Sequence, residues 1–426
     1  MSKFHSDISG FYKLSLGERQ KALSELVNLD DEEVKLLKNF GYFKETQIDS
    51  LIENVVGSYQ LPIGIACNFR INNKDYLIPM VIEESSVVAA ASNAARIARK
   101  HGGFFSEKVD SIMISQIQIT NLTDIEQAKK ILLENKKNIL KLANEQDPIL
   151  VKLGGGAYDF ELRDIETRKG VMLIIHLLVN VLDAMGANVV NTMAESVTPY
   201  IEELCGGKVY LRIVSNLAIH RLAKCKAKFD KDLLGGGEVV KGIVNAYEFA
   251  LADPYRATTH NKGIMNGIIA LTLATGNDTR AIESGAHAYA SLKGKYSPLT
   301  NFDVDAEGNL IGEIKIPLAL GIIGGMTKIH PMARLNLKIL GVKSAAELSQ
   351  VAAAVGLAQN VAALRALAAE GIQRGHMALH SRNIAKLAGV PEDLIDQVAK
   401  KLVEDNKIRI DYAKEILQKI IDKKNL

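Results

Sequence analysis

Four places in the sequence carry side chains that could do chemistry. They are Glu84, which precedes two serines, Lys262 in the run His-Asn-Lys-Gly, Asp278, and the histidines His376 and His380. A carboxyl group and an imidazole can transfer protons, and a lysine kept protonated by a carboxylate can stabilise an oxyanion. Each also has a structural interpretation, because a lone lysine is usually solvated surface and an acid at a helix N-terminus commonly favours the helix.

The two histidines are four residues apart on an expected helix, a spacing that can bind a metal. We expect no metal there, because the pattern shows no further ligand. The three cysteines, Cys67, Cys205 and Cys225, form no CxxC pair, which argues against a cysteine-rich zinc site and against a disulfide framework.

A nucleotide site is indicated by the run Asp183-Ala184-Met185-Gly186-Ala187-Asn188, where an expected strand passes into an expected helix. Small residues let a ligand approach the backbone, and a helix N-terminus offers free N–H groups and the positive end of its dipole to a pyrophosphate. Taken alone, such a turn is more often a plain connection. No GxGxxG follows a strand and no GxxxxGK[ST] occurs, so a Rossmann or P-loop enzyme is not supported.

Two regions of the sequence, with different patterns of expected elements, must position these residues. Between 109 and 217 the expected order is strand, helix, strand, strand, helix, strand, the ferredoxin-like split pattern, at 110–120, 124–144, 159–167, 171–181, 188–204 and 208–215. The remaining sequence predicts alanine-rich helices whose small residues allow close packing around a buried central helix, at 87–100, 238–252, 279–293 and 345–369. We expect Ser85 or Ser86 to cap the helix at 87–100, and Lys262 to lie just before an apolar helix.

We therefore expect an α+β fold. A large domain comprises 1–108 and 218–371, a small dinucleotide-binding domain (109–217) is inserted into it, and a helical C-terminal flap comprises 372–426. Lesser expected elements are strands at 76–82 and 310–317, a glycine-rich loop at 321–327, and helices at 16–29, 31–40, 392–405 and 411–421.

The overall composition excludes some classes of function. The 426 residues carry 52 basic and 49 acidic side chains, so the net charge of +3 gives no electrostatic case for binding nucleic acid. The N-terminus lacks the apolar core of a signal peptide, and apolar stretches such as 263–274 and 171–181 are too short or too polar to span a bilayer. We expect a cytoplasmic protein with no membrane partner.

Six motifs extend the argument, in this order: ENVVG at 53–57, EESSVVAAAS at 83–92, DAMGAN at 183–188, THNKG at 259–263, GND at 276–278 and GIQRGHM at 371–377. Together they resemble the class II 3-hydroxy-3-methylglutaryl-CoA (HMG-CoA) reductases of bacteria and archaea, from about residue 10 to the C-terminus. The resemblance implies a four-electron reduction of HMG-CoA to mevalonate and CoA, using two nicotinamide molecules, in the mevalonate pathway of isoprenoid biosynthesis. It also implies a homodimer, or a larger assembly of dimers, with the active site across the interface.

The resemblance assigns roles to the four charged residues. Lys262 would stabilise the oxyanion at the thioester carbonyl, and His376 would protonate the departing CoA thiolate. Glu84 would donate a proton when the aldehyde is reduced, and Asp278 would join Glu84 and Lys262 in one network. Two alternatives stay open: the reverse reaction, oxidising mevalonate with NAD and CoA, and a non-catalytic nucleotide-binding regulator, which the presence of all four residues disfavours.

Binding residues are implied in the same way. Arg256 would bind a carboxylate of the HMG group, Gln359 would contact CoA, and further residues near the HMG group are Ser86, Asn216 and Asn266. The dinucleotide would contact Asp183, Met185, Gly186, Ala187 and Asn188. Asp147 would accept the ribose 2′-hydroxyl and repel a 2′-phosphate, which favours NADH over NADPH.

Two positions depart from the family pattern. Ser85 stands where some relatives carry proline. Tyr12-Lys13 stands where one relative uses an arginine on CoA. Lys13 keeps the charge but not the bidentate geometry of a guanidinium.

Overall fold

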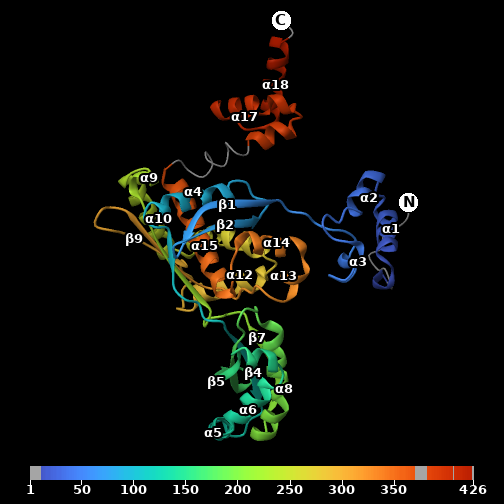
Figure 1. Ribbon diagram of the computed structural model, residues 1–426, viewed down its shortest axis with the longest axis vertical. Coiled ribbons are helices and arrows are strands. Elements are labelled where there is room, and N and C mark those ends of the chain that lie inside the picture. Colours follow the sequence, from blue (N-terminus) through green and yellow to red (C-terminus); the bar gives the residue numbers. More distant parts are fainter. Residues whose placement is uncertain (1–10, 370–380, 406, 425–426) are drawn as a thin grey trace.

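Two antiparallel-rich sheets organise the chain. The computed structural model describes residues 11–369, 381–405 and 407–424 (Figure 1). The larger sheet has the strand order β2-β1-β3-β8-β10-β9, and the smaller has the order β5-β6-β4-β7. In Figure 1 the small sheet and its helices lie at the bottom, and the large sheet lies above them.

The large sheet packs against one side of a central helix. Its strands are β1 (Ile63–Ile71), β2 (Lys74–Val81), β3 (Phe104–Ser106), β8 (Leu222–Phe229), β9 (Thr300–Val304) and β10 (Leu310–Pro317). β1 and β2 form a hairpin closed by Asn72 and Asn73, both with positive φ, as a type I′ turn requires. From the sequence we expected only β2 and β10 of this sheet, and not β1, β3, β8 or β9.

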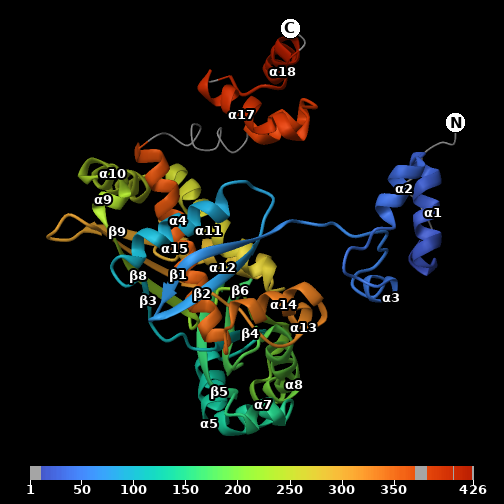
Figure 2. The same cartoon turned by 45° about the horizontal axis from the view of Figure 1, so that its top comes forward.

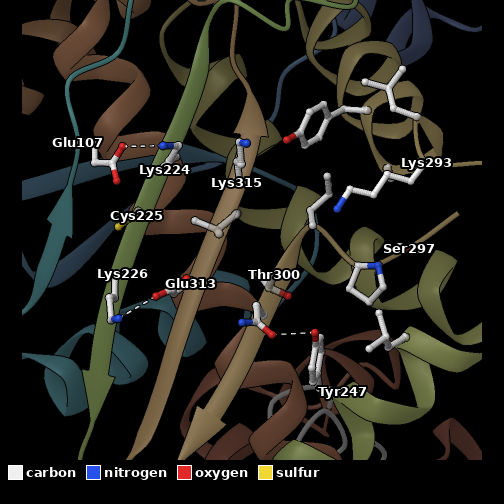
Figure 3. A pocket seen from close by; sticks show the side chains of 18 of the residues that line it. Glu107, Lys224, Cys225, Lys226, Tyr247, Lys293, Ser297, Thr300, Glu313 and Lys315 are labelled. Atoms are coloured by element: carbon white, nitrogen blue, oxygen red, sulfur yellow. Dashed lines mark hydrogen bonds and ion pairs between the residues drawn. The ribbon is translucent and has the colours of Figure 1, made fainter. Parts of the chain in front are cut away.

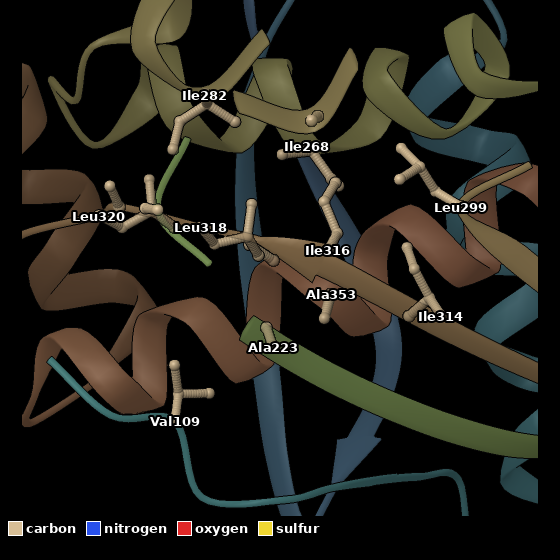
Figure 4. Packing of buried hydrophobic residues seen from close by; sticks show 14 of the residues in the cluster. Val109, Ala223, Ile268, Ile282, Leu299, Ile314, Ile316, Leu318, Leu320 and Ala353 are labelled. Carbon is tan, nitrogen blue, oxygen red and sulfur yellow. The ribbon is translucent and has the colours of Figure 1, made fainter. Parts of the chain in front are cut away.

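Helix α15 (Ala345–Ala369) is the buried central helix that the sequence predicts. It packs against β8, α4 (Val87–Arg99), α10 (Gly237–Ala252) and α11 (Pro254–Ala274). α11 and α15 approach closely, because a Cβ added at Gly356 would meet the side chain of Ile268 at 2.7 Å. Figure 4 shows Ile268 of α11, Ile316 of β10 and Ala353 of α15 packed in this core.

α15 is also the one helix in the described residues that is long and apolar enough to cross a membrane. In the structure, 67% of its most apolar window is buried inside the protein, and strands and helices cover it. It is therefore the core helix of this domain.

The small sheet confirms the split βαββαβ pattern. β4 (Ile112–Thr120) lies between β6 (Gly170–Asn180) and β7 (Lys208–Ser215), and β5 (Gly156–Thr167) is at the edge. Helices α5 (Ile125–Glu134), α6 (Lys136–Asn144) and α8 (Ala187–Cys205) pack on it. The single helix expected at 124–144 is wrong, because it divides at Asn135. The short helix α7 (Pro148–Lys152) precedes β5.

Further helices lie around these sheets. Those of the large part are α9 (Lys231–Leu234), α12 (Thr279–Ser291), α13 (Gly325–Ile329) and α14 (Pro331–Leu340). The expected glycine-rich loop at 321–327 therefore passes into α13. At the N-terminus, a 3-10 helix (Phe11–Lys13) precedes α1 (Leu16–Val27), α2 (Asp31–Leu37) and α3 (Glu45–Ile48). Toward the C-terminus lie a helix at 381–387, a 3-10 helix (Glu392–Leu394), α17 (Ile395–Glu404) and α18 (Ile410–Lys424).

The two terminal helical groups have small cores of their own. Leu16, Ile48 and Val55 form one, and α17 and α18 share another around Val398 and Leu402. Figures 1 and 2 show α1–α3 to one side of the large sheet, joined to β1 by an extended segment. A ring contact between Phe43 and His330, with centroids 4.8 Å apart, links this group to the start of α14.

Candidate active site

An acid and a lysine meet at the surface of the large part of the chain. Nζ of Lys262 lies 3.3 Å from Oε2 of Glu84. Lys262 is within helix α11, not before it as we expected, and Glu84 is in the turn between β2 and α4. Their side chains are 61% and 35% exposed, so a substrate can reach both. Asn266 lies one helical turn beyond Lys262, on the same face of α11.

Ser86 has an unusual backbone next to this pair. Its φ is +76°, in the left-handed region where a residue with a Cβ is strained by about 1–3 kcal/mol. It is the N-cap residue of α4, but its side chain makes no capping hydrogen bond. The expectation that a serine hydroxyl caps α4 is therefore wrong. The strained backbone leaves the hydroxyl without that role, a feature that often marks a binding site.

Arg256, in the first turn of α11, carries a half-buried guanidinium. Among the described residues its guanidinium has no ion pair, and the polar contact at this position is its backbone N–H to Asp253. Burial lowers the pKa of Arg256. A half-buried, unpaired guanidinium suits an anionic ligand.

A buried polar network fixes the rotation of α11 behind these groups. Nε2 of His260 lies 2.6 Å from Oγ1 of Thr300, which donates to the amide oxygen of Asn360 on α15. Asn261 accepts from the backbone N–H of Leu299 and donates to the carbonyl of Ser297. Sequence reasoning missed the roles of His260 and Asn261, although both belong to the motif around Lys262.

Asp278 does not join Glu84 and Lys262 within one chain. It caps α12 by accepting from the backbone N–H groups of Arg280 and Ala281, and it lies 3.3 Å from the guanidinium of Arg280. The twelve residues from Lys262 to the end of α11 at Ala274 span about 18 Å of helix. Among the described residues Asp278 has no hydrogen bond or ion pair to Glu84 or Lys262, so the shared network that we expected is not formed within one chain.

Two other predicted substrate-binding residues, Gln359 and Asn216, also lie in different places, one near α11 and one near α12. Gln359 is 5% exposed, its amide oxygen has no partner among the described residues, and its Cβ faces Gly267, next to Asn266. Asn216 instead lies against α12, since a Cβ at Gly285 would meet its carbonyl oxygen at 2.4 Å. Asn216 is therefore near the helix of Asp278, and Gln359 is near the helix of Lys262.

A cavity of about 640 Å³ contains the predicted dinucleotide residues. Its lining includes Asp147, every residue from 183 to 188, Gly276 to Asp278, and the segment around Gly321 to Thr327. Gly186 has a φ of +102° and precedes α8, and a Cβ there would meet the side chain of Val181 at 2.6 Å. Only glycine fits this turn. The helix N-terminus and the small residues suit a diphosphate.

Two of these acids also have structural partners. Oδ1 of Asp147 caps α7 by accepting from the N–H of Leu150 at 2.9 Å. Oδ1 of Asp183 accepts from the N–H of Ala345 at 2.8 Å, at the start of α15. Asp183 therefore connects the turn to the central helix, in addition to lining the cavity.

A second cavity, of about 620 Å³, lies on the face of the large sheet (Figure 3). Lys224 pairs there with Glu107, and Lys226 pairs with Glu313. None of the predicted catalytic, substrate-binding or dinucleotide-binding residues lines it. It is therefore not the candidate active site.

His376 lies outside the described residues, as does its motif at 371–377. Within the described ranges, no group of three histidine, cysteine or acidic side chains could hold a metal ion.

Comparison with known proteins identifies the family. The sequence model described as hydroxymethylglutaryl-coenzyme A reductase matches residues 15–381. The chain belongs to the HMG-CoA reductase family. It is 60% identical over 415 residues to the 3-hydroxy-3-methylglutaryl-coenzyme A reductase of Archaeoglobus fulgidus, covering 97% of this chain and 95% of the relative. A probable HMG-CoA reductase of Borreliella burgdorferi is 37% identical, with 97% of each chain covered.

Solved structures agree with this membership. The HMG-CoA reductase of Streptococcus pneumoniae matches with a TM-score of 0.76 and 38% identity, over 97% of this chain and 99% of that one. A second structure from that organism, a class II HMG-CoA reductase bound to NADPH in open conformations, has the same score and identity, over 96% and 100%. This chain is thus a member of the class II HMG-CoA reductase family, whose members are oxidoreductases.

Proposed function

We propose that the chain reduces HMG-CoA to mevalonate and CoA in a four-electron reaction, as a step of isoprenoid biosynthesis through the mevalonate pathway. The observation that carries the proposal is the pair of Glu84 and Lys262, an acid and a cation 3.3 Å apart and open to solvent. Reduction of a carbonyl needs both groups, because negative charge develops on the oxygen and a proton must follow.

Lys262 would donate a hydrogen bond to the thioester oxygen and later to the aldehyde oxygen. Glu84, beside it, would give its proton to the aldehyde oxygen in the second reduction. A bound reduced nicotinamide would supply the hydride for each reduction. His376 would protonate the leaving CoA thiolate, whose conjugate acid has a pKa of about 8.5.

The unpaired guanidinium of Arg256 would bind the carboxylate of the HMG group. Asn266, on the same helix, and the free hydroxyl of Ser86 would hydrogen-bond to its polar groups. The unpartnered amide oxygen of Gln359 would accept a hydrogen bond from the ligand, either in the HMG group or in the adjacent part of CoA. Asn216, which follows β7 and lies against α12, would approach the same group.

Asp278 and Asn216 would come from a second subunit. A homodimer related by a two-fold axis gives two equivalent sites, each combining surfaces of both chains. Asp278 lines the dinucleotide cavity of its own chain. That arrangement would present the nicotinamide held by one subunit to Glu84 and Lys262 of the other. The proposed functional units are therefore a substrate-binding large domain (1–108 and 218–371), a dinucleotide-binding domain (109–217) and a flap (372–426).

We also propose that NADH is preferred over NADPH. Asp147 lines the cavity, and Arg280 is the one basic residue in the described lining, where it pairs with Asp278. A carboxylate without a nearby free cation disfavours a 2′-phosphate. The three cysteines are free thiols, in keeping with a reducing cytoplasm.

The direct test is an assay of HMG-CoA-dependent oxidation of NADH and NADPH at matched concentrations. We expect oxidation of two NADH for each mevalonate formed. Absence of HMG-CoA-dependent oxidation with both cofactors would refute the function.

Subunit complementation tests the shared site. Lys262→Ala and Asp278→Ala chains are each expected to be inactive. When the two variants are unfolded and refolded together, half of the dimers contain one chain of each kind. Each of these dimers has one intact site of two, so activity should return to about a quarter of the wild-type value. Lack of recovery in a demonstrated heterodimer would place Asp278 and Lys262 in the same chain's site.

A further inference from the structure

Arg221 is the bulkiest of the side chains that the large core encloses completely. It lies between β7 and β8 and is 1% exposed. Among the described residues no carboxylate forms an ion pair with it. Burial lowers its pKa to about 10, and the negative charge of Asp183 partly offsets that shift. The guanidinium is therefore still charged at neutral pH. Burying an unpaired charge costs several kcal/mol unless other groups compensate it.

Three backbone carbonyls provide that compensation. Nη1 donates to the carbonyls of Ala184, at 3.2 Å, and Met185, at 3.0 Å, and Nη2 donates to that of Leu320, at 2.6 Å. Nε has no partner. The first two carbonyls belong to the turn before α8, and the third belongs to the segment after β10. A single guanidinium thus joins two segments that are far apart in the sequence.

The side of the turn before α8 that is opposite Arg221 faces the cavity. Gly186 and Ala187 line the cavity of about 640 Å³, and Arg221 does not. In a trans peptide the C=O and the N–H point in opposite directions. Because the carbonyl of Met185 points to Arg221, the N–H of Gly186 points away from it. The free N–H groups of the first turn of α8 follow directly.

The segment after β10 is held against the same turn. The N–H of Ile322 donates to the carbonyl of Asp183 at 2.9 Å, and a Cβ at Gly321 would meet the backbone nitrogen of Met185 at 2.5 Å. The amide of Asn277 makes two hydrogen bonds to the backbone of Gly321, at 2.7 and 3.0 Å. Asn277 precedes Asp278, so the position of the turn is coupled to that of Asp278.

We propose that Arg221 is a positioning residue for the dinucleotide. From behind the turn it fixes two carbonyls, so that the N–H groups at the start of α8 face the diphosphate, and it contacts no part of the cofactor itself. The proposal rests on the proposed use of this cavity by a nicotinamide dinucleotide, and it adds a residue that no motif selected.

The test compares Arg221→Met and Arg221→Lys with Arg163→Met, a control for the loss of a guanidinium elsewhere on the small sheet. Arg163 is exposed, its Nη1 lies 3.2 Å from Nε2 of His176, and it does not line the cavity. Binding of NADH to the full chain is measured by fluorescence titration, and KM and kcat are measured for NADH and HMG-CoA. We expect Arg221→Met to raise the Kd and KM for NADH at least about tenfold, with the KM for HMG-CoA within about twofold of the wild type.

Arg221→Lys keeps the charge but loses the fork that reaches three carbonyls, so its Kd should lie between those of the wild type and Arg221→Met. This variant decides the matter if Arg221→Met does not fold. An unchanged Kd in the folded variants, or equal increases in both KM values, would overturn the positioning role. Failure of the wild type to bind NADH or NADPH would instead overturn the proposed function, which keeps the two outcomes distinct.

Discussion

Nζ of Lys262 and Oε2 of Glu84 lie 3.3 Å apart although 178 residues separate them in the sequence. Helix α11 carries the lysine past the end of β2, where the turn into α4 places the glutamate. The contact is solvent-accessible and weak as a source of stability. Its close geometry therefore adds little to stability and agrees with the roles proposed for the two groups.

Replacement of Lys262 should remove activity and leave the fold intact. Lys262→Ala is expected to lower kcat by at least about a thousandfold, or about 4 kcal/mol of transition-state stabilisation. Because the side chain is 61% exposed, the free energy of unfolding should change by less than about 0.5 kcal/mol. Steady-state assays and urea unfolding check both values, with Lys293→Ala as a control. Substantial turnover in the folded variant would contradict the role of Lys262.

Ser86 should trade stability for function. Ser86→Gly relieves the strain of φ +76° and is expected to raise the free energy of unfolding by about 1 kcal/mol. Loss of the hydroxyl should lower kcat/KM for HMG-CoA about tenfold or more. Ser86→Ala keeps the strain and loses the hydroxyl, so only its activity should fall. Equal stability of the two variants would show that this backbone is not strained.

His260 should make stability depend on pH. Burial, with a contribution from the charge of Arg256, lowers its pKa to about 3. The unfolded imidazole, with a pKa of about 6.5, binds the proton first, so this stability is present above pH 6.5 and is lost as the pH falls toward 3. Between pH 7.5 and 5.5 we expect His260 to cost about 1.4 kcal/mol.

Urea unfolding at the two pH values measures that loss. His260→Gln can still hydrogen-bond to Thr300 but does not titrate, so its loss of stability between pH 7.5 and 5.5 should be smaller than that of the wild type. Burial also lowers the pKa of His176. The variant His176→Gln therefore measures how much of the pH dependence of stability comes from the small sheet and not from His260. An identical pH dependence in wild type and His260→Gln would contradict the prediction.

Asp147 should select against the 2′-phosphate. Asp147→Asn can still cap α7 through Leu150 but has no charge, whereas Asp147→Ala loses the cap as well, at a cost of about 1 kcal/mol. Both variants should raise the ratio of NADPH to NADH efficiency several-fold, and only Asp147→Ala should be less stable. An unchanged ratio in Asp147→Asn would remove this carboxylate from cofactor selection.

His376 should matter for only one of the two reductions. His376→Gln is expected to slow reduction of HMG-CoA by about a hundredfold or more, because the thiolate leaves without a proton donor. Reduction of added mevaldehyde, which releases no thiolate, should fall far less. Equal losses with both substrates would contradict protonation of CoA by this residue.

Periodicity predicted much of the fold and only part of the site. The small sheet was predicted because its strands alternate clearly and its turns carry glycine. β8 was missed because alanine and lysine alternate along it, and neither residue favours strands. Motif resemblance selected Glu84, Lys262 and Asp278 together but carries no distances. Because Lys262 is in α11 and Asp278 caps α12, the two residues have different partners in the fold. Arg221 is buried and lies outside every motif, so no local sequence pattern indicated its role.

The apolar character of α15 has a consequence for biosynthesis. If its 25 residues left the ribosome with nothing to pack against, they could aggregate or enter a bilayer, since their length and composition suit a membrane. The described strands and helices that pack most closely on α15, namely α11, α10, α4, β8 and β10, precede it in the sequence. The residues that cover the helix are thus already synthesised when the helix appears, so it can be buried as soon as it leaves the ribosome.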